Sequence, residues 1–280
     1  MIEILKAALF GLVEGVTEWL PVSSTGHMIL LNEFVKLDVS QDFWNMFLVV
    51  IQFGAILAVI LLYWKTIWPL GLYRHRKRTR IIWKKDTLML WVKTIVACIP
   101  AGIVGVLFDD WLDAHFYNWL VVSIMLILVG AAFIVVETVF KDRKPVITDL
   151  KDIGFKEALI IGVFQLVAAV FPGTSRSGST IIGGLLIGVS RTVAAQFTFI
   201  LAIPVMAGAS LLKMVKYGFH FTGMETAILL TGMIVAFAVS VIVIRFLMGF
   251  IRKHDFKVFG WYRIVLGALV IAYFALIARV

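Results

Sequence analysis

The chain has 280 residues, of which 61% are hydrophobic and only 15% are charged, and its mean hydropathy is +1.01. A soluble globular protein has an apolar share nearer half, so this composition indicates a protein that crosses a membrane several times. The net charge of +9 would suggest a nucleic-acid partner in a soluble protein, but membrane proteins collect Lys and Arg in cytoplasmic loops, so no nucleic acid is expected. The single cysteine, Cys98, excludes an internal disulfide, a CxxC redox pair and a thiolate metal cluster.

The first apolar region, residues 1–37, is interrupted near its middle by the polar string PVSSTGH at 21–27. Because it contains Glu14 and Glu18 and has no basic leader, we do not expect it to be a cleaved signal peptide. The piece after the string, 28–37, would rise only about 15 Å as a helix, whereas the hydrocarbon of a bilayer is about 30 Å thick. We therefore expect a re-entrant hairpin, in which a short helix returns to the side from which the first helix entered.

Six segments are long and apolar enough to span a bilayer, which takes about 20 residues. They cover approximately 43–64, 87–108, 119–140, 192–214, 226–248 and 261–280. Between the third and the fourth, the region 156–190 is interrupted by the string PGTSRSGST at 172–180, which predicts a second re-entrant hairpin. The predicted fold is an all-α integral membrane protein of one domain, residues 1–280, with six transmembrane helices and two re-entrant helical hairpins.

The distribution of basic residues predicts the orientation. With this topology, 18 of the 26 Lys and Arg residues fall on one side, which is then cytoplasmic. They comprise eight in 65–85, five in 141–156, four in 249–263, and Arg191. The run 74–85 is expected to be an orientation signal that also meets anionic lipid. Both termini and the acidic residues Asp109, Asp110 and Asp113 should face outward, so that the first hairpin enters from outside and the second from the cytoplasm.

An internal repeat is predicted from the same pattern. A shift of 151 residues aligns Gly11, Glu14, Pro21 and Ser24 with Gly162, Gln165, Pro172 and Ser175. Each hairpin is followed by three spans, so the halves, approximately 1–140 and 156–280, would have opposite topology, as in proteins where broken helices meet near the membrane midplane. Coincidence among common Gly, Pro and Ser residues is the alternative.

Glu14 and Glu18 are four residues apart, so on a helix their side chains share one face. Two carboxylates cannot both be ionised there without compensation: one takes up a proton, a cation binds between them, or an arginine approaches. The alternative is a face open to water at the mouth of the hairpin. Because the segment is apolar on both sides of the pair, we interpret both residues as functional candidates.

The first tip offers hydroxyls and an imidazole where the short return helix should begin. Free amides at a helix N-terminus bind anions such as phosphate, although Ser24 or Thr25 could equally be only a helix cap, with His27 an interior residue. Hydroxyl, imidazole and carboxylate together are the groups that phosphoryl chemistry uses, which favours a catalytic role for Ser24 and His27. Ser23, Thr25 and Gly26 are the neighbouring phosphate-binding candidates.

The second tip adds a cation. Arg176 lies between Ser175 and Ser177, and flanking glycines would let amides, hydroxyls and the guanidinium converge on one oxyanion. Arg176 could also pair with Glu14 or Glu18 across the predicted repeat axis, and a phosphate could replace that pairing. The phosphate-binding candidates of this tip are Gly173, Thr174, Ser175, Ser177 and Thr180.

Other polar residues have simpler explanations. Glu137, Lys93 and Arg245 lie near span ends, where side chains ordinarily extend to the membrane interface. The histidines with no ligand spacing around them are expected in solvated loops; they are His75, His115, His220 and His254. The chain contains no GxxxxGK[ST], HExxH or GxSxG motif, so ATP hydrolysis, zinc proteolysis and elbow-type esterase chemistry are not indicated.

The strings from Glu14 to His27 (EGVTEWLPVSSTGH) and from Pro172 to Gly178 (PGTSRSG) closely resemble the two signatures of the bacterial undecaprenyl-diphosphate phosphatases, the bacitracin-resistance family. The resemblance extends over essentially the whole chain. It implies an enzyme of the bacterial cytoplasmic membrane that hydrolyses undecaprenyl diphosphate to undecaprenyl phosphate and inorganic phosphate. It further implies recycling of the lipid carrier for peptidoglycan synthesis, bacitracin resistance, and an active site open to the extracytoplasmic side.

In that family the functional set is an acidic pair, a serine and a histidine of the first tip, and an arginine of the second. These map onto Glu14, Glu18, Ser24, His27 and Arg176. The resemblance also implies a divalent cation, Mg²⁺ or Ca²⁺, which Glu14 and Glu18 would bind. Two mechanisms stay open: attack by Ser24, with His27 or a glutamate as base, or direct attack by water. We favour Ser24.

A competing function is a transporter or flippase for a phosphate-bearing lipid or an anion, because inverted repeats with broken helices are a transporter plan. The concentration of Ser, His, Glu and Arg at the two tips favours the enzyme, and it leaves a purely structural scaffold in last place. The expected partners are a polyprenyl diphosphate substrate, membrane lipids and a second copy of the chain in a homodimer.

Overall fold

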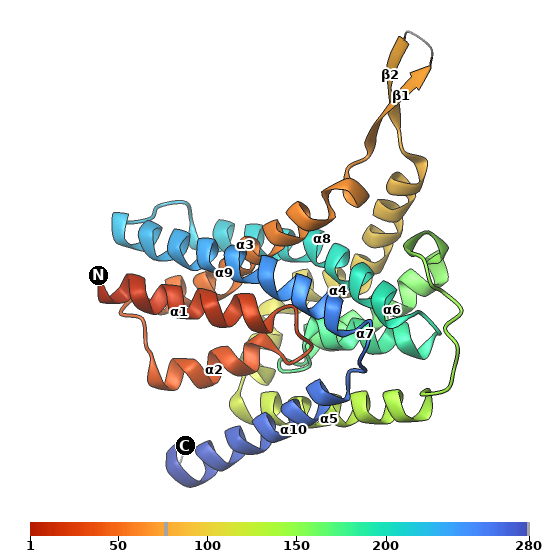
Figure 1. The fold of residues 1–280 in the computed structure, drawn as a ribbon. Coiled ribbons are helices and arrows are strands. Elements are labelled where there is room, and N and C mark those ends of the chain that lie inside the picture. Colours follow the sequence, from red (N-terminus) through yellow and green to blue (C-terminus); the bar gives the residue numbers. More distant parts are fainter. Residues whose placement is uncertain (76–77, 279–280) are drawn as a thin grey trace.

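The computed structural model describes residues 1–75 and 78–278 and is built almost entirely of helices (Figure 1). In chain order the elements are α1 (Ile2–Thr17), α2 (Ser24–Phe34), α3 (Gln41–Ile67), β1 (Leu70–His75), β2 (Arg78–Trp83), α4 (Lys85–Phe116), α5 (Trp119–Val139), the 3₁₀ turn η1 (Leu150–Asp152), α6 (Phe155–Val170), α7 (Arg176–Leu186), α8 (Arg191–Tyr217), α9 (Gly223–Phe250), α10 (Lys257–Ala272) and the π-helical η2 (Tyr273–Ala278).

Within the described residues, six helical segments are long and apolar enough to cross a membrane. They are Gln41–Ile67, Lys85–Phe108, Trp119–Val139, Arg191–Tyr217, Gly223–Phe250 and Lys257–Leu276. Each contains or overlaps one predicted span, so the prediction of an all-α multi-pass membrane protein is confirmed. The side chains of Asp109, Asp110, Asp113 and His75 lie outside the described part of the structure.

Several long helices begin where the sequence supplies a capping side chain. Ser40, Asn118, Ser190 and Thr222 precede α3, α5, α8 and α9, and each side chain accepts a hydrogen bond from the amide three residues later. Such a cap satisfies one of the amides that the first helical turn leaves without a partner. These caps fix the residues at which the four helices start.

A short helix of only 11 residues follows each polar string, while the re-entrant hairpins themselves stay a prediction. At 1.5 Å per residue, α2 and α7 would each rise about 16 Å, too little to cross a bilayer. The interruption before α2 differs from expectation, because α1 ends at Thr17, before Pro21 is reached. The Glu18 amide still donates to the Glu14 carbonyl at 3.0 Å, so both glutamates keep helical spacing.

A feature that the sequence analysis missed is the antiparallel hairpin formed by β1 and β2, in which Leu70 pairs with Trp83 and His75 with Arg78. From the sequence, residues 65–85 are expected to form only a basic loop. Figure 1 shows the hairpin projecting from the ends of α3 and α4, away from the other helices. Helix α4 also continues to Phe116, beyond the end of the predicted span.

The predicted inverted repeat stays a prediction, and the packing supports it. Helix α1 packs against α9, where an added Cβ at Gly11 would lie 2.4 Å from the Gly232 carbonyl oxygen. The aligned residue of the second half, Gly162 on α6, packs against α4 in the same way, 2.4 Å from the Ala97 carbonyl oxygen. Close approach of backbones at small residues is a common way to pack helices in membranes.

The sequence offset that relates matched residues in the two halves of the predicted repeat changes at the tips. Ser23 and Ser175 are the non-glycine residues with positive φ, 73° and 68°, among those described. Each precedes a short helix and caps it, accepting a hydrogen bond from the amide of Gly26 or Gly178. The local counterpart of Ser175 is therefore Ser23, and the sequence alignment of Ser175 with Ser24 is wrong by one residue.

Candidate active site

Helices α5 and α10 form the platform on which both tips rest. The two helices lie side by side (Figure 1), and an added Cβ at Gly130 or Gly260 would lie 2.7 Å from the other residue's carbonyl oxygen. On this platform Gly26 of the first tip contacts Leu126, and Gly173 of the second tip, at φ +90°, lies against the backbone of Val122. A side chain at residue 173 would be both strained and blocked, so glycine is required there.

Arg263 on α10 fastens both tips to this platform. Its side chain is fully buried, and it donates hydrogen bonds to the carbonyl oxygens of Pro21 at 3.2 Å, Gly173 at 2.8 Å and Thr174 at 2.9 Å. Longer contacts of 3.4 Å reach the carbonyl oxygens of Met125 and Leu126 on α5. The expectation that Arg263 belongs to a cytoplasmic loop is wrong, because its side chain is buried in the interior.

The centre of the site is the Glu18 carboxylate, which is 7% exposed. Nη2 of Arg176 donates to its Oε1 at 2.9 Å, and the Ser24 hydroxyl donates to its Oε2 at 2.8 Å. The Ser177 hydroxyl donates to the Glu18 backbone carbonyl at 3.1 Å. The expected meeting of an acid from the first tip with the arginine of the second is therefore present in the structure.

Further contacts hold the Arg176 guanidinium in place. Nη1 donates to the Thr198 carbonyl oxygen on α8 at 2.9 Å, and the Thr180 and Thr198 hydroxyls lie 2.8 Å apart. The Arg176 Cζ atom lies over the buried Trp19 ring, 6.0 Å from its centroid, within the range of a cation–π contact. Sequence reasoning missed Trp19 and Thr198, since neither carries a motif and Thr198 is brought to the tip only by folding.

Glu14 lies one helical turn before Glu18 and is 1% exposed. It interacts electrostatically with both Glu18 and Arg176, but its Oε1 atom has no hydrogen-bond partner among the described residues. Nε of Arg176, Nε1 of Trp19 and the Thr174 hydroxyl are likewise buried without a partner there. Buried polar atoms are usually satisfied, so these four atoms are available to bind water or a polar ligand.

The donor set also bears on the divalent cation that the resemblance implies. Among the described residues no group of three or more His, Cys, Asp or Glu could hold a metal ion. Glu14 and Glu18 supply two carboxylates, and Mg²⁺ is commonly held by one or two carboxylates together with substrate phosphate oxygens. The unpartnered oxygen of Glu14 fits such a cation, provided that the substrate completes the coordination.

His27 is not directed toward Ser24. Nδ1 lies 2.7 Å from the Ser23 carbonyl oxygen, and Nε2 lies 2.7 Å from the Tyr262 hydroxyl on α10. The two rings are stacked at a centroid distance of 5.6 Å. Both ring nitrogens are therefore engaged with partners other than the Ser24–Glu18 pair.

The remaining predicted phosphate-binding residues lie at the two tips but have different surroundings. Ser23 and Ser175 are helix caps, and Ser175 also contacts the Ser177 hydroxyl at 3.1 Å. Thr25 and Pro172, one from each tip, line a cavity of about 180 Å³ that opens beside them. This cavity lies next to both tips.

The residues given simpler explanations divide into confirmed and wrong assignments. Glu137 does not extend to the interface: it is 4% exposed, pairs with Arg191 through two nitrogens and accepts the Phe256 amide at 3.1 Å. His115 is exposed but belongs to α4 and not to a loop, whereas His220 and His254 are exposed outside helices as expected.

Comparison with known proteins gives a consistent result. Residues 7–269 match the family model described as "Bacitracin resistance protein BacA". The chain is 59% identical to the undecaprenyl-diphosphatase of Desulfitobacterium hafniense over 275 residues, which cover 98% of this chain and 97% of that protein. It is 58% identical to undecaprenyl-diphosphatase 1 of Clostridium acetobutylicum over 276 residues, 99% of each chain, and 58% identical to the undecaprenyl-diphosphatase of Enterococcus faecalis over 270 residues, 96% of each. The chain therefore belongs to the bacitracin resistance protein BacA family.

Proposed function

We propose that this membrane protein hydrolyses undecaprenyl diphosphate to undecaprenyl phosphate and inorganic phosphate, and thereby recycles the lipid carrier of peptidoglycan synthesis and confers bacitracin resistance. The observation that carries the proposal is the buried Glu18 carboxylate held between the Arg176 guanidinium and the Ser24 hydroxyl. These are an acid, a cation and a nucleophile within one hydrogen-bonded unit. The names of the relatives support the substrate.

In the proposed reaction the site first neutralises the negative charge of the diphosphate. Arg176 already pairs with a carboxylate in the structure, and a guanidinium fork binds phosphate oxygens in a similar way. A diphosphate that takes Arg176 away from Glu18 gains a charge-assisted contact and leaves Glu18 free to act as a base. A divalent cation on Glu14 and Glu18 would add positive charge beside the phosphates.

The geometry favours Glu18 over His27 as the proton acceptor of Ser24. The Ser24 hydroxyl already donates to Glu18 at 2.8 Å, while both His27 nitrogens bind elsewhere. In the proposed step the Ser24 Oγ atom bonds to the terminal phosphorus, its proton passes to Glu18, and the bond to the bridging oxygen breaks. Undecaprenyl phosphate leaves, and water then hydrolyses the phosphoserine to release inorganic phosphate.

The location of the protein follows from the proposed substrate. A lipid-linked diphosphate requires an enzyme in the bacterial cytoplasmic membrane, with the prenyl chain in the hydrocarbon region and the diphosphate at the tips. The cavity lined by Thr25 and Pro172 lies beside both tips, and we propose that the headgroup approaches from there. We place the opening of the site on the extracytoplasmic side, since the basic loops are expected to face the cytoplasm.

The test is phosphate release from undecaprenyl diphosphate by the purified protein, with and without a chelator. Glu18→Gln and Arg176→Gln should each lose about 10³-fold or more in rate while staying folded in detergent. Arg245→Gln is the matched control, because this exposed arginine of α9 lies outside the site. Near-wild-type rates for either site variant would refute the assignment.

A second measurement separates the mechanisms. Labelled phosphate should be trapped on the wild-type protein and not on Ser24→Ala, whereas direct attack by water predicts no trapping on either. The same reconstituted sample should be assayed for transfer of undecaprenyl phosphate between leaflets. Lipid transfer without any phosphate release would favour the transporter function instead.

A further inference from the structure

A second polar pocket lies at the opposite end of α7 from Arg176. Its volume is about 290 Å³, and its lining comes from the end of α5 and the loop after it, the α7–α8 loop, the start of α8 and the end of α9. The charged residues around it are Glu137, Lys141, Arg143, Arg191 and Arg252, and Ser190 and Thr192 add hydroxyl groups. Three basic segments that are far apart in the sequence therefore meet at this one pocket.

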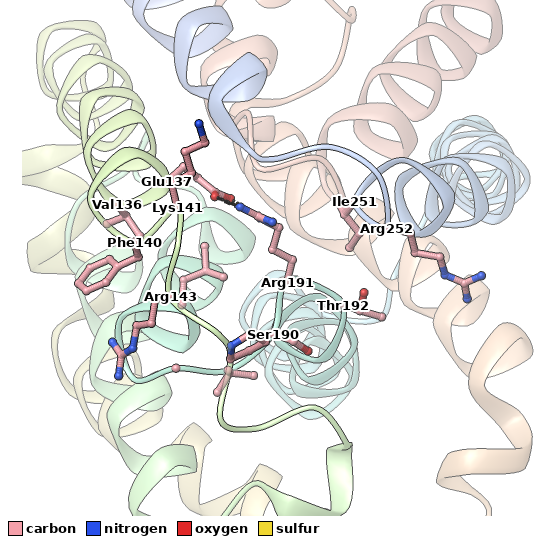
Figure 2. A pocket seen from close by; sticks show the side chains of 14 residues that line it. Val136, Glu137, Phe140, Lys141, Arg143, Ser190, Arg191, Thr192, Ile251 and Arg252 are labelled. Carbon is pink, nitrogen blue, oxygen red and sulfur yellow. Dashed lines mark hydrogen bonds and ion pairs between the residues drawn. The ribbon is translucent and has the colours of Figure 1, made fainter.

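The pocket carries an excess of positive charge. Four of its side chains are cationic and one, Glu137, is a carboxylate, whose oxygens bind Nε and Nη2 of Arg191 and the Phe256 amide. Within the described residues, Lys141, Arg143 and Arg252 form no salt bridge. Figure 2 shows Arg191 reaching Glu137, while the charged ends of Lys141, Arg143 and Arg252 lie apart from this pair and point away from it. Within the lining, the single carboxylate is already paired with Arg191, so the other three cations have no carboxylate partner there.

Some of these groups are fixed in position, which distinguishes the pocket from a merely basic surface. Arg143 donates to the Leu186 carbonyl oxygen at 3.1 Å, and its Cζ atom lies 5.3 Å from the centre of the Phe140 ring. Arg191 is oriented by Glu137, and its Nη1 atom makes no hydrogen bond within the described residues. The first turn of α8, which begins at Arg191, also presents backbone amides without intrahelical acceptors.

The pocket is separate from the Glu18 site. Along α8, Arg191 precedes Thr198, the residue that binds Arg176, by seven positions, which is about 10 Å. Between the two sites lies a hydrophobic cluster that includes Phe133, Ile182, Ala195 and Phe199. A ligand in the pocket would therefore not contact Glu18 or Ser24.

We propose that this basic pocket binds a phosphate-bearing anion, supplied either as the headgroup of an anionic lipid or as a free phosphate ion. Arginine forks match the oxygens of a phosphate group, and the net positive lining compensates its charge. The position at the ends of membrane-spanning segments suits a headgroup, since basic pockets between helix ends on the basic side of a membrane protein bind anionic headgroups. This site does not depend on the proposed hydrolysis.

The test compares two double variants of the full-length protein in detergent. Arg143→Gln/Arg252→Gln removes two cations of the pocket, and Lys144→Gln/Lys253→Gln removes the adjacent basic residues, which do not line it. Binding of phosphatidic acid is measured by native mass spectrometry and binding of inorganic phosphate by calorimetry, with phosphatidylcholine as the neutral-headgroup control. Phosphate release from undecaprenyl diphosphate is measured in parallel and should be unchanged in both double variants.

The pocket variant is expected to bind phosphatidic acid roughly tenfold more weakly than wild type, with a much smaller effect of the adjacent pair. A selective loss for the lipid alone identifies a headgroup site, and a selective loss for inorganic phosphate identifies a site for the free ion; either result supports the pocket. Equal losses in the two double variants would show a diffuse attraction and overturn the proposal. Unchanged binding by the pocket variant would overturn it as well.

Discussion

Replacing Arg263 with methionine is expected to lower the rate of phosphate release about 100-fold while the protein stays folded. Arg263 takes no part in the proposed chemical step, but it is the one described side chain that donates to carbonyls of both tips. Methionine fills a similar volume and cannot donate. The substitution therefore removes the shared anchor without creating a large cavity.

The size of the effect follows from the contacts. Three tip carbonyls would lose donors at 2.8–3.2 Å, at a cost of about 1–3 kcal/mol each where no other donor replaces them. Removing a buried guanidinium that has no carboxylate partner among the described residues offsets much of this cost. Global stability should change little, whereas the tips become free to separate.

A separation of about 1 Å would be enough to disrupt the site. The Glu18–Arg176 distance of 2.9 Å would grow to about 3.9 Å, and the phosphoryl group that Arg176 binds in the proposed reaction would move equally far from Ser24 and Glu18 of the other tip. Misplacement of catalytic groups on this scale costs about 100-fold in rate, or about 2.7 kcal/mol in the activation barrier. Because the affected contacts act on the transition state, kcat should fall more than KM rises.

The assay is steady-state phosphate release from undecaprenyl diphosphate, with thermal unfolding in detergent measured on the same samples. Arg263→Lys keeps one cation but cannot span both tips, so its kcat should lie between those of wild type and Arg263→Met. Arg245→Met, on the exposed face of α9, is the control and should behave as wild type. A folded Arg263→Met protein with wild-type kcat would refute the anchoring role.

Three further predictions concern the caps, the packing and the proton acceptor. Ser23→Gly should unfold near the wild-type temperature, because glycine tolerates φ of 73°, whereas Ser23→Ala loses the cap and should cost about 1–2 kcal/mol in chemical denaturation. Gly11→Ala places a Cβ 2.4 Å from a carbonyl oxygen of α9 and should destabilise by about 1–3 kcal/mol, whereas Gly208→Ala meets nothing within 4 Å and should not lower the unfolding temperature. Glu18→Gln should abolish trapping of labelled phosphate, while His27→Gln should retain it at a rate reduced roughly tenfold; the reverse result would assign the base to His27.

The sequence predicts the six spans well because bilayer thickness dictates the length of an apolar run. It also predicts the tips, since a polar string such as PVSSTGH in an apolar region is tolerated only where protein or water shields it. The approach of an arginine was one of three ways to compensate the acidic pair that the sequence left open. Folding selects it by bringing together residues separated by 158 positions.

The interior arginine could not be predicted from its sequence neighbourhood. Arg263 lies near the start of an apolar run, where a basic side chain ordinarily extends to the membrane surface. Its burial depends on five carbonyls contributed by three other parts of the chain, Pro21, Gly173–Thr174 and Met125–Leu126. Glu137 was misassigned for the same reason, because its partner Arg191 lies 54 positions away.

The strand hairpin was missed for a different reason. Residues 65–85 carry eight basic residues, so the segment was interpreted from its charge alone. Leu70 pairs with Trp83 at the base of the hairpin, next to the ends of α3 and α4. The two helices therefore hold the strands together at that end. Composition predicted the side of the membrane there but not the backbone conformation.

The two tips use one backbone geometry for two different chemical tasks. Each has a serine cap with positive φ, and the next residue, Ser24 in one case and Arg176 in the other, opens the short helix. These two residues bind the two oxygens of the same Glu18 carboxylate, at 2.8 and 2.9 Å. Neither tip alone holds both a nucleophile and a cation. Glu18 brings the two together, because its carboxylate binds Ser24 of one tip and Arg176 of the other. In the proposed reaction the terminal phosphoryl group takes over from Glu18 as the anion on Arg176, and the released carboxylate becomes the base for Ser24, so binding of the substrate and activation of the nucleophile are one event.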